Sequence, residues 1–179
     1  AFLVERSDAK AKFDLLSKAV EQSPVAIIIC DAEGQISYVN HQFDRLTGLY
    51  SEHILGQQLT SIYPARLQPI IAEEMRQVMA GMELAQGQLE ITRTDGQVYW
   101  QKYCLRSIVD PKQQSHLLLE IEDITIQKCA EQQWMESELR FRTLLDNTPE
   151  ISVQGYEADG TTFYWNKASE KVYGYSKEE

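Results

Sequence analysis

Residues 94–128 read TDGQVYWQKYCLRSIVDPKQQSHLLLEIEDITIQK, and they carry the pattern that decides the fold. Two runs rich in aromatic and aliphatic residues, 98–109 and 116–124, flank the turn-forming residues Asp110 to Gln114. A third run, 84–92, precedes the turn Thr94-Asp95-Gly96. Antiparallel strands can be joined by connections this short, so we predict a three-stranded antiparallel meander.

The sequence before this meander supplies the other half of an α+β domain. The apolar residues 25–30 and the alternating residues 35–40 predict two more strands, joined by a turn at Asp31 to Gly34. Asn40 can cap a short helix through its side chain, and the apolar spacing from Pro69 to Met82 predicts a longer helix. Together these elements predict a five-stranded antiparallel sheet with helices on one face.

We expect amphipathic helices on both sides of this domain. Residues 2–22 carry an apolar stripe at helical spacing, formed by Phe2, Ala9, Phe13, Leu16 and Val20, and Pro24 ends the pattern. From Ile126 onward, the 4-3 spacing typical of coiled coils runs through Ala130, Trp134, Ser137, Phe141, Leu144 and Thr148. This pattern predicts a homodimer, and the alternative is one amphipathic helix packed on its own domain.

Composition limits the classes of function. The formal net charge is −10 without any basic run, so we expect no nucleic-acid partner. No apolar stretch approaches the roughly 20 residues that span a bilayer, and the first residues are too charged for a signal peptide. Cys30, Cys104 and Cys129 lack C-x-x-C spacing, which favours a reducing, cytoplasmic location without a metal site. The chain begins without Met, so we expect a piece of a longer protein.

Part of the sequence repeats after about 125 residues. The first match pairs Leu16–Pro24 with Phe141–Pro149, and the later ones pair Glu33-Gly34 with Asp159-Gly160, Tyr38-x-Asn40 with Tyr164-x-Asn166, and Leu46-x-Gly48 with Val172-x-Gly174. These matches divide the chain into a helix (1–22), a domain (23–125), a linker helix (126–148) and the start of a second copy (149–179). Because an isolated hairpin is marginal in water, we expect residues 150–179 to be poorly ordered or to borrow a partner surface.

The stretch from Val20 to Lys128 resembles the Per-Arnt-Sim (PAS) family in the order of its landmarks. These are Ser23-Pro24-Val25-Ala26-Ile27, Asp31-Ala32-Glu33-Gly34, Tyr38-Val39-Asn40 with Phe43 and Gly48, Ile54-Leu55-Gly56, Thr94-Asp95-Gly96 with Trp100, and Glu122-Asp123-Ile124-Thr125. No single landmark is specific, but their order and spacing together carry the resemblance. It implies a PAS fold for this stretch and the start of a second PAS repeat after it.

The resemblance implies a sensory module that binds haem, flavin, a small carboxylate or nothing. Haem is not expected, because the helix at 69–82 has no histidine and His41, His53 and His116 lie elsewhere. Residues 49–59 contain no Asn-Cys dipeptide, which excludes the photoreactive flavin chemistry of the family. A pocket between sheet and helices would be lined by Ile28, Cys30, Phe43, Ile62, Ile71, Met75, Val78, Trp100, Tyr103 and Leu118. A filled core explains the same residues equally well.

Asp123 and Thr125 lie where the last strand passes into the exit helix. In the family such residues tie the sheet to the signalling helix, and simple helix capping is the alternative. No nucleophile with a base stands out, so we predict no catalytic site in this fragment. We expect a sensory module of a bacterial signalling protein that relays a ligand or partner signal to an output domain of histidine kinase or GGDEF/EAL type. A ligand-free dimerisation spacer is the alternative.

Overall fold

The computed structural model describes residues 2–146, 148 and 150–176, with side chains from Lys10 onward. The chain divides into two compact units, residues 1–126 and 127–179. The first contains α1 (Phe2–Glu21), β1 (Ala26–Cys30), β2 (Ile36–Val39), α2 (His41–Thr47), α3 (Ser51–Ile54), the 3₁₀ helix η1 (Leu59–Ile62), α4 (Gln68–Met79), β3 (Ala85–Thr92), β4 (Val98–Val109) and β5 (Ser115–Asp123). Helix α5 (Thr125–Asp146) leads into β6 (Gln154–Tyr156), β7 (Thr162–Trp165) and α6 (Lys167–Tyr173) of the second unit.

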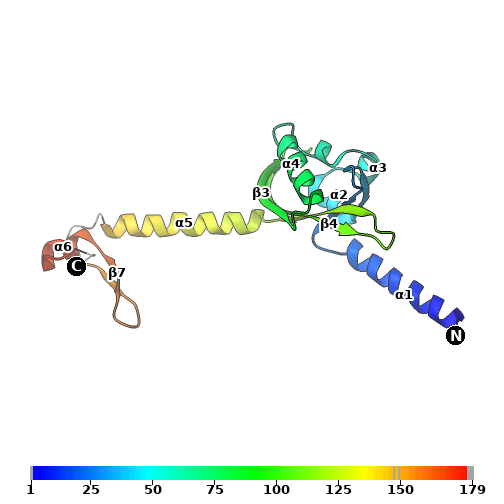
Figure 1. The fold of residues 1–179 in the computed structure, drawn as a ribbon. Coiled ribbons are helices and arrows are strands. Elements are labelled where there is room, and N and C mark those ends of the chain that lie inside the picture. Colours follow the sequence, from blue (N-terminus) through cyan, green and yellow to red (C-terminus); the bar gives the residue numbers. More distant parts are fainter. Residues whose placement is uncertain (1, 147, 149, 177–179) are drawn as a thin grey trace. The chain divides into compact units, whose positions relative to one another are not determined.

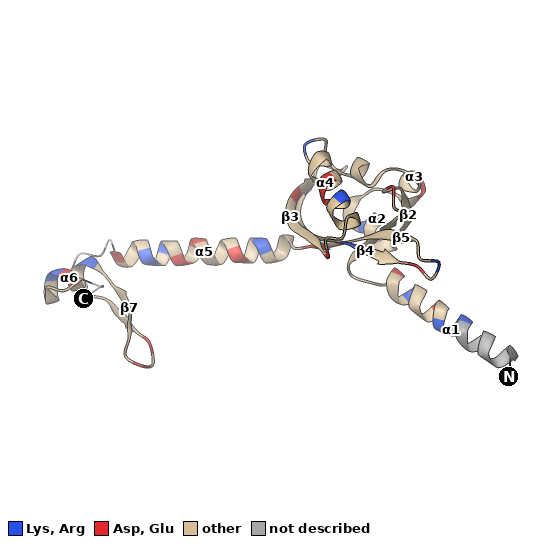
Figure 2. Cartoon of the chain, in the orientation of Figure 1, with Lys and Arg blue, Asp and Glu red and all other residues tan. Residues whose placement is uncertain are grey.

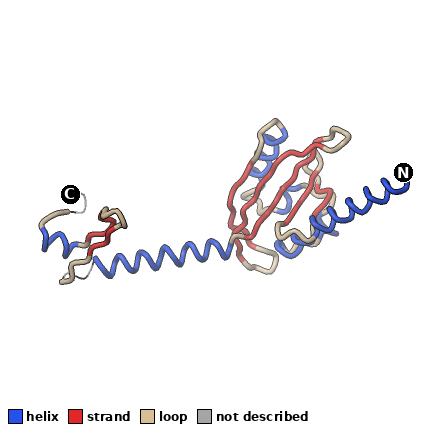
Figure 3. Tube along the Cα trace, turned by 90° about the horizontal axis from the view of Figure 1, so that it is seen from below, coloured by secondary structure: helices blue, strands red, loops and turns tan. Residues whose placement is uncertain are grey.

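The five strands of the first unit form one antiparallel sheet in the order β2-β1-β5-β4-β3 (Figure 3). Strands β3, β4 and β5 form the predicted meander, in which Ala85 pairs with Leu105 and Leu105 with Leu119. Strand β1 pairs with β5, placing Ala26 opposite Ile121. The predicted five-stranded sheet with helices on one face is therefore confirmed (Figure 1).

The core lies between the sheet and the helices α2, η1 and α4. Along β4 and β5, burial alternates with the pleat, so Tyr103, Leu105, Leu119 and Ile121 face this core. Helix α2 adds Phe43, which is fully buried. Burying one such aromatic or aliphatic side chain contributes about 1.5–3 kcal/mol, so this layer accounts for much of the stability of the domain.

Asn40 fixes the start of helix α2. Its side-chain oxygen accepts hydrogen bonds from the backbone N–H groups of Phe43 (3.3 Å) and Ile27 (2.9 Å). Its side-chain nitrogen donates to the carbonyl oxygens of Val20 and Val25, each at 3.0 Å. The predicted cap is therefore confirmed, and the same side chain also ties the end of α1 to β1.

The structure differs from the sequence prediction mainly in short elements. Helices α3 and η1 were not predicted, since four residues each are too few to show a helical period. Helix α4 ends at Met79 and not at Met82, because Gly81 takes a left-handed conformation (φ 111°) and breaks the helix. In α1, the side chains of Phe2 and Ala9 lie outside the described residues.

The second unit repeats the local structure of the first hairpin and helix. Asn166 caps α6, accepting from Ser169 and Val153 backbone N–H groups and donating to the carbonyls of Leu145 and Ile151. Strands β6 and β7 pair with an irregularity after the second pair, as β1 and β2 do. Residues 177–179 and Pro149 lie outside the described residues. The expected disorder or borrowed surface of residues 150–179 stays a prediction.

Helix α5 has no buried residue along its described length. Basic and acidic residues are both spread along it (Figure 2), and Arg142 pairs with Glu138 one turn earlier at 2.6 Å. Large apolar side chains nevertheless stand exposed on it, including Trp134, Phe141 and Leu144. Within the described residues, no helix combines the length and the apolar character needed to cross a bilayer.

Candidate functional site

Most of the predicted pocket residues form a filled core. A single hydrophobic cluster contains Ile28, Cys30, Phe43, Ile71, Met75, Val78 and Tyr103, and Ile62 packs against it. Burial raises the pKa of the Cys30 thiol to about 12, so this side chain behaves as a small apolar residue. The alternative explanation for these residues, that they simply pack, therefore accounts for the centre of the domain.

Trp100 and Leu118 were wrongly placed in the predicted pocket. Both are half-buried and alternate with the buried residues Tyr99 and Leu117 along their strands, so they lie on the face of the sheet that is opposite to the helices. The reason is the two-residue period of a strand, which sends neighbouring side chains to opposite faces. An aromatic residue on a strand therefore indicates a pocket only when the register shows that its side chain faces the helices.

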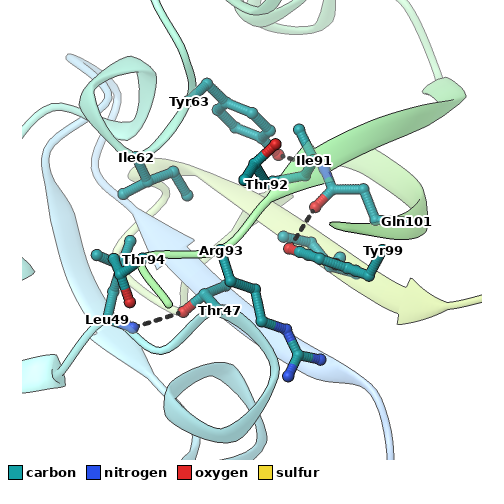
Figure 4. A pocket seen from close by; sticks show the side chains of 11 residues that line it. Thr47, Leu49, Ile62, Tyr63, Ile91, Thr92, Arg93, Thr94, Tyr99 and Gln101 are labelled. Atoms are coloured by element: carbon teal, nitrogen blue, oxygen red, sulfur yellow. Dashed lines mark hydrogen bonds between the residues drawn. The ribbon is translucent and has the colours of Figure 1, made fainter. Parts of the chain in front are cut away.

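A small cavity lies at one end of the core, beside the predicted pocket. Its volume is about 90 Å³, and it lies between the end of α2, η1 and the ends of β3 and β4 (Figure 4). The lining residues are Thr47, Leu49, Ile62, Tyr63, Ile91, Thr92, Arg93, Thr94, Tyr99, Gln101 and Ile121. Of the residues predicted to line a pocket, only Ile62 is among them. A larger hollow, about 310 Å³, lies beside α4 and includes Met75.

Three of the lining residues form a row of hydrogen-bonded polar groups. The Tyr99 hydroxyl donates to Gln101 Oε1 at 3.0 Å, and Gln101 Nε2 donates to the Tyr63 hydroxyl at 3.3 Å (Figure 4). Burial raises the pKa of Tyr99 to about 12 and that of Tyr63 further still, so both hydroxyls stay neutral. Gln101 lies between the two tyrosine hydroxyls and is itself buried.

A second polar contact, which is partly buried, joins α4 to the sheet. The Tyr103 hydroxyl donates to Glu74 Oε1 at 2.7 Å, and burial together with this carboxylate raises the pKa of the tyrosine. The other carboxylate oxygen of Glu74 is buried without a hydrogen-bond partner among the described residues. The aromatic ring lies against Gly87, where an added Cβ would approach within 2.7 Å of it.

Arg93 connects the cavity to the end of the sheet. Its side chain lines the cavity, and its guanidinium carbon lies 5.0 Å from the centre of the Tyr99 ring (Figure 4). One terminal nitrogen lies 3.6 Å from Asp123 Oδ2. Its Nε is buried and has no hydrogen-bond partner among the described residues. A buried donor without an acceptor costs about 1–3 kcal/mol, so this group has unused capacity to bind an acceptor.

The structure places Asp123 and Thr125 at the junction of β5 and α5, as predicted. Asp123 Oδ1 accepts from the Thr125 backbone N–H at 2.9 Å and from the Thr125 hydroxyl at 2.5 Å. Thr125 Oγ1 also accepts from the Trp100 backbone N–H at 2.9 Å, which joins the start of α5 to β4. The contact goes beyond capping, because it reaches a neighbouring strand as well as the helix start.

Sequence reasoning missed the polar residues that line the cavity. The spacing Tyr99-x-Gln101-x-Tyr103 on a strand would have placed Gln101 on the same face as the two tyrosines, because side chains two residues apart share a face. A polar residue on the buried face in turn implies a hydrogen-bond partner inside the domain. Arg93 offered no such indication. It follows a strand and precedes a turn, where an exposed arginine is ordinary.

Comparison with known proteins identifies the class of this domain. The model of the PAS fold family matches residues 20–128, and the chain belongs to that family. Two solved PAS domains share the fold. One, from Colwellia psychrerythraea, has a TM-score of 0.56 at 22% identity and covers 63% of this chain and 97% of that one. The other, from a two-component sensor histidine kinase, has a TM-score of 0.52 at 16% identity and covers 64% and 98%.

Among curated proteins, the chain is similar to a regulatory protein. The Nitrogen fixation regulatory protein of Klebsiella oxytoca is 29% identical over 141 residues, which are 78% of this chain and 28% of that protein. This chain therefore spans less than a third of the length of the curated relatives that it matches. It is a PAS sensory or regulatory module.

Proposed function

We propose that this PAS domain senses a small ligand or a partner and passes the change to α5, which joins a second copy of the chain and leads to an output domain. The proposed output domain is of histidine kinase or GGDEF/EAL type in a bacterial protein, and the fragment itself acts by conformation and not by catalysis. We place it in the cytoplasm, which its three free cysteines favour. The observation that carries the proposal is the junction of Asp123, Thr125 and β4.

The junction supports a relay because it joins three parts with one side chain. Thr125 Oγ1 accepts from the Trp100 N–H on β4 and donates to Asp123 on β5, while its backbone begins α5. Asp123 in turn lies 3.6 Å from Arg93, which lines the cavity. A displacement of Arg93 therefore changes the charge next to the group that holds the first turn of α5.

Exchange of backbone amide hydrogens tests the junction. Thr125→Val keeps the shape of the side chain but removes both of its hydrogen bonds, and Thr125→Ser is the control that keeps them. We expect Thr125→Val to speed exchange in the first turn of α5 and in the neighbouring part of β4 by about tenfold, from the loss of roughly 1–1.5 kcal/mol. Equal exchange in the two variants would remove the basis of the relay.

Exposed apolar side chains on α5 support the proposed dimer. Trp134 (68% exposed), Phe141 and Leu144 fall on the predicted coiled-coil positions. An exposed apolar stripe on an amphipathic helix marks a surface that packs against another surface. A second α5 with the same spacing is the complementary surface, since two copies of one stripe form a symmetric interface.

Sedimentation of matched variants tests the dimer. Trp134→Asp puts a charge on the predicted seam, whereas Met135→Asp puts it one residue away on an equally exposed apolar position (65%). We expect the first to convert the dimer to a monomer at tens of micromolar and the second to leave it dimeric. A monomeric wild type at that concentration, or equal effects of both substitutions, would contradict this model.

The filled centre of the core favours a second candidate, a ligand-free dimerisation spacer. Phe43, Ile28 and Leu105 leave the middle of the domain closed. A spacer would dimerise as strongly as a sensor but would bind no small molecule. Native mass spectrometry of the purified chain distinguishes the two, since a bound mass in addition to the dimer supports the sensor.

A further inference from the structure

We propose that a hollow between α5 and the β6-β7 hairpin (the hairpin hollow) is a docking site for a second copy of this chain, and that Arg140 of that copy lies in it. The inference rests on the proposed dimer of α5 and names a further contact within that dimer. It is carried by the lining of the hollow, by the position of Arg140 in the heptad pattern and by the small apolar area of the α5 seam.

The hairpin hollow lies within the second unit and has a volume of about 210 Å³. Helix α5 forms one wall with residues that are three or four positions apart and therefore share one face of the helix. These residues are Glu138, Phe141, Arg142 and Leu145. The hairpin forms the other wall, to which it contributes Gly155 and the rings of Phe163 and Tyr164. This largely apolar lining suits the stem of a long side chain.

The hairpin of the second unit differs here from its counterpart in the first domain. At Gly155 an added Cβ would lie 2.6 Å from the Phe163 ring, so the ring packs directly against the strand. The register places Ile29 and Ser37 at the equivalent points of the first hairpin. Because Phe163 nevertheless remains 54% exposed, the second unit presents an aromatic ring where the first presents a serine.

The apolar seam of α5 alone provides little area for a dimer. Trp134, Phe141 and Leu144 are the large apolar side chains at its predicted positions, and they are 68%, 62% and 64% exposed. In two copies they would bury roughly 800 Å² of apolar surface. Stable interfaces bury about 1,200–2,000 Å² in total, of which about 65% is apolar in homodimers. The seam is therefore near the lower limit, and the hairpin hollow, which shares Phe141 with it, offers the additional surface.

The heptad pattern places Arg140 of a second copy beside the hairpin hollow. When Phe141 takes heptad position a and Leu144 position d, Arg140 takes position g and Leu145 position e. In a parallel two-stranded coiled coil, each g residue lies next to the e residue of the following heptad on the other helix. Since Leu145 lines the hollow, Arg140 of the second copy lies at its opening.

Arginine fits this lining chemically. Its apolar stem packs along aliphatic side chains, and its planar guanidinium group stacks on aromatic rings such as those of Phe163 and Tyr164. Glu138 beside the hollow pairs with Arg142. Asp146 accepts a hydrogen bond from the Tyr164 hydroxyl but forms no salt bridge with another described residue. One carboxylate is therefore in excess beside the hollow, which favours a cation from the partner.

Arg140 is free to make such a contact. It is exposed on α5 and makes no hydrogen bond or ion pair with another described residue. Arg142, by contrast, is held by Glu138 one turn earlier. Docking of Arg140 on a second copy therefore costs hydration and side-chain freedom but breaks no contact within its own chain.

Dissociation of the dimer of the full chain, measured by sedimentation in a double-mutant cycle, tests the contact. Arg140→Ala and Phe163→Ser should each raise the dissociation constant about five- to tenfold. The double variant should raise it little more than either substitution alone, because both remove the same contact. Effects that multiply, or an unchanged constant in either single variant, would overturn the inference. Arg140 is exposed on a helix, so its replacement leaves the fold intact even if Phe163→Ser opens the hairpin.

Two substitutions control for charge and for exposed apolar surface. Arg45→Ala removes a positive charge from an exposed helix position in the first domain. Val172→Ser removes an exposed apolar side chain of α6 that lies outside the hairpin hollow. Both should leave the dissociation constant within about twofold of wild type. A control that weakens the dimer as much as Arg140→Ala does would assign the effect to net charge or to general stability and would overturn the docking.

Disulfide cross-linking tests the parallel arrangement on which the position of Arg140 depends. In a Cys129→Ser background, Ser137→Cys places a thiol at seam position d, where the two helices of a parallel dimer face each other. Leu139→Cys places a thiol at an outer position of the same helix, where the side chain is 67% exposed. We expect Ser137→Cys alone to form a covalent dimer under mild oxidation. Equal cross-linking of the two variants would rule out the parallel seam and the docking with it.

These results are distinguishable from failure of the proposed dimer. If Trp134→Asp abolishes the dimer but Arg140→Ala and Phe163→Ser do not weaken it, the α5 seam stands and the docking is overturned. If the wild type is monomeric at tens of micromolar, the dimer itself is wrong and the docking fails with it.

Discussion

The first hairpin with its helix, β1-β2-α2, and its repeat, β6-β7-α6, share local structure but differ in what covers them. Asn40 and Asn166 each cap a helix and hold two carbonyl groups with the same atoms. Gly48 and Gly174 end the helices in the same left-handed conformation, at φ 72° and 76°. Local hydrogen bonds therefore determine this conformation without help from the rest of the sheet.

The two copies differ at the positions that face the core in the first domain. Ile28 and Phe43 are fully buried there, and the register places Gln154 and Ser169 at the same points of the second copy. Ser169 bonds to Ser152, and Gln154 also bonds to Ser152. Polar side chains that bond to one another need less cover than apolar ones, which explains how the second copy keeps its shape with few buried residues.

The largest expected difference between the copies concerns an apolar helix position. Leu46 in α2 is 3% exposed and its counterpart Val172 in α6 is 66% exposed. Leu46→Ala should lower the free energy of unfolding of the first domain by about 2–5 kcal/mol, and Val172→Ala should change that of the second unit by less than about 0.5 kcal/mol. Amide exchange, read separately in β4 and β7, measures both.

A large effect of Val172→Ala would break this comparison. It would mean that another surface covers α6 in solution, as expected if the second unit borrows a partner. The same experiment at two protein concentrations shows whether that surface comes from a second copy of the chain.

Removal of the capping asparagines should have the next largest effect. Asn40→Ala leaves the carbonyls of Val20 and Val25 without this partner and removes the cap of α2. We expect a loss of roughly 2–3 kcal/mol in the first domain. Asn166→Ala removes the same set of bonds, so amide exchange should show β6 and α6 opening together while β1 and β4 stay protected. Protection that falls equally in both units would contradict their independence.

Glycine substitutions at the ends of the two helices isolate a single tertiary contact. Gly48→Ala and Gly174→Ala both force alanine into a left-handed conformation, which costs about 1–2 kcal/mol. At Gly48 the added Cβ would also lie 2.9 Å from Thr94 Oγ1, whereas at Gly174 nothing lies within 4 Å. We expect Gly48→Ala to cost more by about 1 kcal/mol. The difference in urea midpoint, with each variant compared with wild type, measures the packing of Thr94 on α2.

Much of the fold was predictable from the sequence because its determinants are local. The strand limits of Val98–Val109 and the cap at Asn40 follow from alternation and from side-chain chemistry. The same local patterns account for the likeness of β1-β2-α2 and β6-β7-α6, while the start of a second PAS repeat stays a prediction. Register was harder, because the face to which Trp100 points depends on which neighbour is buried.

The site was less predictable because its residues come together only in the folded sheet. Arg93 meets Asp123 and Tyr99 through the pairing of β3, β4 and β5, which no short motif specifies. Asp123 and Thr125 were found because they are neighbours in the sequence and bond to each other. Contacts between neighbours leave a pattern in the sequence, and contacts across strands do not.

The smallest expected effect comes from removing the hydroxyl group of one tyrosine in each copy. Each of these two tyrosines bonds to the end of a helix. The Tyr38 hydroxyl donates to Glu21 at 2.5 Å, and the Tyr164 hydroxyl donates to Asp146 at 2.8 Å. Each is partly exposed, so replacement by phenylalanine should cost about 0.5–1 kcal/mol in either copy. Burial, followed by the neighbouring carboxylate, raises the pKa of both from 10.0 to about 12.

The pH dependence of these two contacts follows from the sign of the shift. Because the folded pKa lies above the unfolded value, each hydroxyl contributes its full stability below about pH 10 and loses it as the pH rises toward 12. The difference between wild type and Tyr38→Phe should therefore be constant from pH 7 to 9 and shrink above pH 10, and Tyr164→Phe should behave alike. A difference that persists above the folded pKa would assign the role of these tyrosines to ring packing, and the likeness of the two copies would then lie in shape and not in a shared hydrogen bond.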